Sequence, residues 1–153
     1  MDAVTYPETK VINFLSKNFI PVRCHVGENK TLPERFNVHW TPTLVVANAQ
    51  GTIHHSITSF MPPDELVSQL EFALAKASFD KGDYQASFQG FNSVVEKYPK
   101  NIIAPEALYW SAVSEYKLKH SSEALMNGWK RLMKEYPDSD WTKKLKFFLE
   151  GEQ

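Results

Sequence analysis

The run Trp40-Thr41-Pro42-Thr43-Leu44-Val45-Val46 is followed, after the turn at Gln50-Gly51, by a second strand-like run at residues 52–58. An apolar, β-branched run of this length is typical of a buried strand. Gly51 suits a turn position that requires positive φ. In the second run apolar and polar residues alternate, as they do on a half-buried strand. The stretch predicts a β-hairpin that a Thr-Pro turn introduces.

The residues on either side of this hairpin predict an α/β unit. Pro7 and Glu8 suit the first turn of a helix that continues to residue 18. A strand is expected at 19–26 and a short helix at 29–36. After the hairpin, Leu at spacings of four residues predicts one long helix from about 62 to 81.

This order of elements resembles the thioredoxin fold from its second helix onward, over about residues 4–80. The resemblance implies that Pro42 is cis and that Thr41 offers its backbone to an extended peptide. Trp40, Thr41 and Pro42 are therefore the expected peptide-binding residues. The alternative for Trp40 is that its ring covers the edge of the sheet.

Two features of that family are absent from this sequence. Its Cys-x-x-Cys motif is missing, and the one cysteine, Cys24, is expected to be an inert core residue. The first two strands and first helix are missing as well, which removes a central strand and exposes two rows of backbone polar groups. The remaining strands could pair directly, a second copy could complete the sheet as a homodimer, or the natural chain could start upstream of Met1.

The second half of the sequence contains an internal repeat. Five pairs of residues match at a spacing of 38, and such a period is typical of stacked helical hairpins. The pairs are Ala86 and Ala124, Phe91 and Trp129, Val94 and Leu132, Tyr98 and Tyr136, and Pro99 and Pro137.

The repeat resembles tetratricopeptide repeats, in which a small alanine lets two helices approach closely and a proline ends the second helix. Residues 139–149, with Trp141, Leu145 and Phe148, are expected to form a capping helix. The resemblance implies peptide or protein binding. Four aromatic residues lie at helical spacing, Tyr109, Trp110, Tyr116 and Trp129, and the candidate groove residues are Tyr109, Trp110 and Tyr116. The alternative for these rings is core packing. The predicted fold is an incomplete thioredoxin-like α/β domain at 1–80 followed by an all-α, tetratricopeptide-like domain at 81–153.

Composition narrows the classes of partner. The net charge of −1 gives no broad attraction to nucleic acid or to an anionic membrane. No apolar run is long enough to cross a bilayer, and the first residues do not form a signal peptide, so a cytoplasmic location is expected. Neither Cys24-His25 nor His54-His55 forms a metal pair, because adjacent strand residues face opposite sides. No metal, cofactor or catalytic residue is expected.

These observations predict a protein-interaction module that lacks redox activity in the sequence given. The competing interpretation is an enzyme, a thiol-disulfide oxidoreductase of cell redox homeostasis, whose Cys-x-x-Cys lies upstream of Met1. The two differ in whether upstream sequence would bring in two cysteines and disulfide reduction.

Overall fold

The computed structural model describes residues 1–150, except the side chains of residues 148 and 150. The described chain divides into two compact units, the first at residues 1–70 and the second from residue 71 onward. This division lies inside the long helix α3 (Pro63–Asp80), and the predicted domain boundary at residue 80 stays a prediction. The last three residues of the predicted second domain, and the side chain of Phe148, lie outside the described residues.

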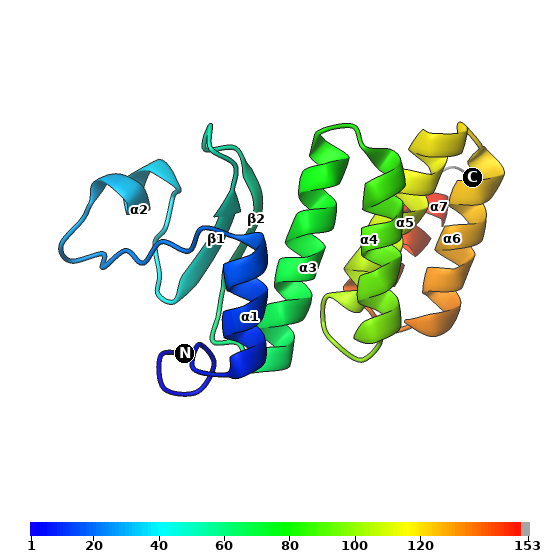
Figure 1. The fold of residues 1–153 in the computed structure, drawn as a ribbon. Helices are drawn as coiled ribbons and strands as arrows, with labels where there is room; N and C mark the ends of the chain where they lie inside the picture. Colours follow the sequence, from blue (N-terminus) through cyan, green and yellow to red (C-terminus); the bar gives the residue numbers. More distant parts are fainter. Residues whose placement is uncertain (151–153) are drawn as a thin grey trace. The chain divides into compact units, whose positions relative to one another are not determined.

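The first unit contains two helices and one hairpin before α3 begins (Figure 1). Helix α1 (Thr9–Asn18) and helix α2 (Thr31–Arg35) precede strands β1 (Thr43–Ala47) and β2 (Ile53–Thr58), which form a two-stranded antiparallel sheet. The side-chain oxygen of Asn29, two residues before α2, accepts hydrogen bonds from the backbone N–H groups of Thr31 and Leu32 and so stabilises the start of this helix. The helices and hairpin predicted for this unit are thus present.

The strand predicted at 19–26 is wrong. Residues 19–25 have no helix or strand assignment, and 26–28 form a turn. Ile20 and Val22, which were expected to be part of a buried sheet, are 93% and 76% exposed. The physical reason is that a strand needs a neighbour to pair with its backbone, and the described residues offer none at this position. Completion of the sheet by a second copy stays a prediction.

The hairpin forms as expected, with one irregularity. Asn48 accepts hydrogen bonds from the backbone N–H groups of Gln50 and Thr52, and Gly51 has a φ of 87°. The register shifts between Val46 and Ala47. Across that bulge the expected alternation fails. Ile53 is 42% exposed, whereas His54 is buried.

The sheet is less buried than the sequence predicts. Val46 is the one buried residue of β1, because few other elements cover the faces of this two-stranded sheet. The expectation that Cys24 is a core residue is wrong, because Cys24 is only half-buried and lies in the irregular segment. The apolar core of this unit comes from α1, β1, Met61 and the first half of α3: Val11, Val46, Met61, Leu66, Val67 and Leu70.

The second unit is built from helical hairpins (Figure 1). The last part of α3 precedes α4 (Tyr84–Lys97), α5 (Ala104–Lys119), α6 (Ser122–Glu135) and α7 (Asp140–Glu150). The bounds of α4 and α6 differ by 38 residues at each end, which confirms the sequence period. Asp83 caps α4 and Ser121 caps α6, each by accepting a hydrogen bond from the backbone N–H three residues later.

The helices of each hairpin approach closely at a glycine. A methyl group placed on Gly90 would lie 2.8 Å from the Cβ of Ala75, and one on Gly128 would lie still closer to the Cβ of Ala112. These two glycines are also 38 residues apart. These close contacts lie one helical turn beyond Ala86 and Ala124, to which the resemblance assigns a close approach of the helices.

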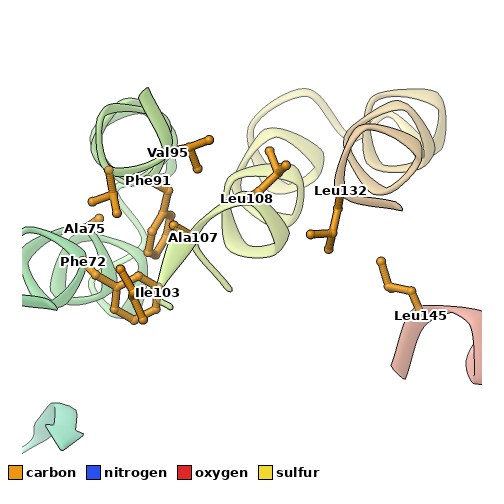
Figure 2. Packing of buried hydrophobic residues seen from close by; sticks show 10 residues of the cluster. Phe72, Ala75, Phe91, Val95, Ile103, Ala107, Leu108, Leu132 and Leu145 are labelled. Carbon is orange, nitrogen blue, oxygen red and sulfur yellow. The ribbon is translucent and has the colours of Figure 1, made fainter. Parts of the chain in front are cut away.

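The core of the second unit runs through all its helices (Figure 2). Phe72 packs against Phe91 with ring centroids 5.2 Å apart, and both rings are at most 1% exposed. The remaining members of the core are Ala75, Val94, Val95, Ile103, Ala107, Leu108, Leu132 and Leu145.

We predict that Gly128→Ala destabilises the protein by up to about 2 kcal/mol. Alanine favours a helix by about 1 kcal/mol, but overpacking a rigid contact costs about 1–3 kcal/mol. The added methyl also meets the Cα of Ala112 at 3.1 Å, so a side-chain rotation cannot relieve the clash. Urea denaturation measures the loss, and Asn127→Ala, at an exposed position one residue earlier, is the control. In an Ala112→Gly background, which removes the opposing methyl group, Gly128→Ala should cost much less stability than it does in the wild type, and an equal loss in both backgrounds would contradict the assigned contact.

Candidate functional site

The Thr-Pro turn of the first unit is exposed. The Thr41–Pro42 peptide bond is cis, as expected. Trp40 is 74% exposed, so its ring does not cover the sheet edge. The hydroxyl of Thr43 donates to the carbonyl oxygen of Trp40 at 2.7 Å and lies 2.9 Å from the hydroxyl of Thr58. These bonds tie the turn to the start of β1 and leave the Trp40 ring open to solvent.

The second unit brings five aromatic rings together, and these rings form the aromatic row: Phe79, Trp110, Tyr109, Trp141 and Trp129. Phe79 lies 5.1 Å from Trp110 between ring centroids, and Trp110 lies 5.7 Å from Tyr109. Tyr109 then contacts Trp141 at 4.7 Å and is nearly parallel to Trp129 at 6.1 Å. All five rings are half-buried, so part of each remains accessible.

Two lysines lie over the aromatic row. The ammonium group of Lys76 is 5.0 Å from the Trp110 ring centroid and 5.6 Å from that of Phe79. The ammonium group of Lys144 is 4.6 Å from the centroid of Trp141. These are cation–π distances, so the lysine stems cover apolar surface while their charges stay near solvent. The row therefore offers apolar and positively charged groups side by side.

Two carboxylates lie near these lysines, and one of them, Asp80, forms an ion pair with Lys76. Trp110 donates its indole N–H to the other, Glu106, at 3.4 Å. Burial raises the pKa of Glu106, and the Trp110 hydrogen bond and the charges of Lys144 and Lys76 oppose that rise. The electrostatic balance of the row thus depends on two lysines and two acids, of which Glu106 is half-buried.

The sequence predicted only part of this site. The structure brings Tyr109 and Trp110 together, whereas Tyr116 makes none of the ring contacts found among the described residues. Phe79, Trp141, Lys76 and Lys144 were missed as site residues. Trp141 had been assigned to the capping helix, and a signal was available in the helical spacing of Trp141 and Lys144. The row was not apparent from the sequence because its rings come from four helices, α3, α5, α6 and α7.

The described residues contain no cluster of three potential metal ligands. Among the same residues, no helix is both long enough and apolar enough to cross a bilayer. Cys24 lies near the carbonyl oxygen of Asn29, with its sulfur 3.9 Å away, and no second cysteine exists in the sequence.

Comparison with known families supports the repeat. The family model of the tetratricopeptide repeat matches residues 70–101 and again residues 106–139. These matches cover the hairpins of α3 with α4 and of α5 with α6, and repeats of this kind are typical of protein-interaction modules. No curated protein and no solved structure matches the chain. The thioredoxin-like resemblance of the first half receives no support from these comparisons.

We predict that Glu106→Gln stabilises the protein at neutral pH and has little effect in acid. A raised pKa means that folding favours the protonated acid, so this contribution is complete below the ordinary pKa of 4.5 and is lost as the pH rises through the higher, folded-state pKa. Glutamine stays neutral and keeps an acceptor for Trp110. Thermal unfolding from pH 4 to 8 should show the gain growing with pH. Glu123→Gln, an exposed change of the same charge on α6, should show no such growth.

Proposed function

We propose that this chain is a protein-interaction module that binds peptide segments of partner proteins on the aromatic row and has no redox activity of its own. The observation that carries the proposal is the row itself. Five half-exposed rings and two lysines lie on helices that two tetratricopeptide repeats hold in place. Aromatic side chains dominate binding energy at protein interfaces, because they bury a large area and lose little conformational entropy.

The turn at Trp40, Thr41 and Pro42 is the second proposed contact for an extended peptide. Its support is the exposure of Trp40, an isolated large aromatic ring on a turn that hydrogen bonds fix to β1. An exposed, well-anchored aromatic side chain is a typical interface residue. Tyr116, which lies two helical turns beyond Tyr109 on α5, is proposed to flank the bound peptide.

The proposed absence of redox activity is supported by the cysteine content. Disulfide reduction by a dithiol needs a thiolate and a resolving thiol, and this sequence contains only Cys24. The competing proposal, a thiol-disulfide oxidoreductase with its Cys-x-x-Cys upstream of Met1, requires residues that the sequence given does not contain.

We predict that Tyr109→Ala weakens peptide binding at least tenfold. Peptides are selected from a random display library against the chain, and their Kd values are measured by fluorescence anisotropy. Truncating a central aromatic ring at an interface typically costs about 2 kcal/mol or more, which is more than tenfold in Kd. Trp40→Ala tests the turn in the same assay.

The matched control for both variants is Phe147→Ala, because this ring is 83% exposed and lies outside the row. Circular dichroism confirms that each variant is folded. Selected peptides whose Kd is unchanged in both Tyr109→Ala and Trp40→Ala would contradict the two assigned surfaces.

We predict that Cys24→Ser leaves disulfide chemistry unchanged. In an insulin-reduction assay with dithiothreitol, the wild-type chain and the variant should both give the rate of dithiothreitol alone. A wild-type acceleration that disappears in Cys24→Ser would show that this thiol is reactive, and the proposed lack of redox activity would then be wrong.

A further inference from the structure

The second repeat ends in an open hollow. The hollow has a volume of about 250 Å³ and lies between α5, α6 and α7. It is lined by Tyr109, Trp129, Trp141, Lys144 and Leu145. Small-molecule pockets usually measure about 300–1,000 Å³, so this space suits a single large side chain.

Each repeat contains a pair of aromatic rings at equivalent positions, and the two pairs differ in how deeply they are buried. Tyr109 follows Phe72 by 37 residues, and Trp129 follows Phe91 by 38. Phe72 and Phe91 are fully buried in the cluster that includes Ile103 and Ala107, as Figure 2 shows. Tyr109 and Trp129 are only half-buried. The first pair is therefore closed by the next hairpin, and the second pair is left accessible.

One residue of α7 explains why the second pair stays open. At the spacing of 37, Leu145 corresponds to Leu108, and both are buried. At the same spacing Lys144 corresponds to Ala107, which is fully buried in the first interface. A lysine cannot be buried there without losing its hydration, and its ammonium group instead lies over Trp141. The helix that caps the repeats thus places a positive charge at the rim of an aromatic hollow.

The positive charge of Lys144 at the edge of the hollow determines which kind of peptide residue binds beside it. On the same helix Lys143 pairs with Asp140 at 3.1 Å, whereas the described side chains show no ion pair for Lys144. Besides the Trp141 ring, Lys144 interacts electrostatically with Glu106, whose pKa is raised because the carboxyl group is partly buried. A cationic ligand would meet the ammonium group that already covers Trp141, so the aromatic walls favour an apolar group and the rim favours an anion.

We propose that this hollow binds one aromatic or large aliphatic side chain of a partner peptide in which the next residue is Asp or Glu. The apolar side chain fills the space against Tyr109, Trp129 and Trp141, and the carboxylate pairs with Lys144. This inference rests on the proposed function, because it specifies the peptide chemistry that the aromatic row recognises.

The test compares three fluorescein-labelled Gly-Ser peptides of equal length that carry Phe-Asp, Phe-Lys or Ala-Asp at the centre. Anisotropy titrations of the full chain should show Phe-Asp binding about tenfold more tightly than either other peptide, which corresponds to about 1.4 kcal/mol. Lys144→Glu should reverse the preference to Phe-Lys. Lys143→Glu, the matched change on the adjacent residue, should keep the wild-type order.

Two outcomes would overturn the inference and leave the proposed function standing. In one, library-selected peptides bind but Lys144→Glu leaves the order of the three probes unchanged. In the other, sedimentation shows self-association that Lys144→Glu abolishes, which would assign the hollow to a second copy of the chain. If neither the probes nor any library peptide binds, both the inference and the proposed function fail. Circular dichroism on each lysine variant confirms that a lost preference does not come from lost folding.

Discussion

The second unit depends on the close approach of paired helices at Gly90 with Ala75 and at Gly128 with Ala112. At these points there is no room for another methyl group, so the spacing within each hairpin is fixed by the absence of side chains. Close spacing brings Phe72 onto Phe91 and Tyr109 beside Trp129. The same contact therefore determines both the core and the position of the rings that form the aromatic row.

The aromatic row follows from where the repeat ends. A stack of hairpins buries each ring pair by adding the next hairpin, and the last pair needs a cap. Helix α7 supplies Trp141 and Leu145 to this cap, while Lys144 keeps the space beside them open. A terminal helix that covers its neighbours completely would leave only polar surface. Here it leaves rings, a hollow and a positive charge, and the proposed binding rests on this surface.

The sequence predicts the helical half well, because its signals are local. The 38-residue period predicts α4 and α6. The same period relates Asp83 to Ser121 and Gly90 to Gly128, so applying it to these residues would have located the helix caps and the tight helix contacts. The first half is predicted less well, because a strand is a long-range structure. Residues 19–26 have strand-like composition, but composition does not supply a pairing partner. The alternation of apolar and polar residues in the sequence likewise does not predict the bulge that buries His54.

The candidate site was only partly predictable for the same reason. Tyr109 and Trp110 stood out as aromatic residues on one helix, but their contacts with Phe79 and Trp141 arise from packing between helices. The roles of Lys76 and Lys144 depend on where their stems lie, which periodicity does not give. Tyr116 shares the helix and the residue type, yet the ring contacts of the row do not reach it.

The central claim is that partners bind on the repeat at the aromatic row, and the four tryptophans of the chain report on it directly. Nitrogen-15 labelling gives one indole N–H signal each for Trp40, Trp110, Trp129 and Trp141. During titration with a library-selected peptide, the account predicts that the signals of Trp129 and Trp141 shift most and that of Trp110 shifts with them. If a bound peptide shifts the Trp40 signal alone and leaves the three row signals unchanged, the account is contradicted.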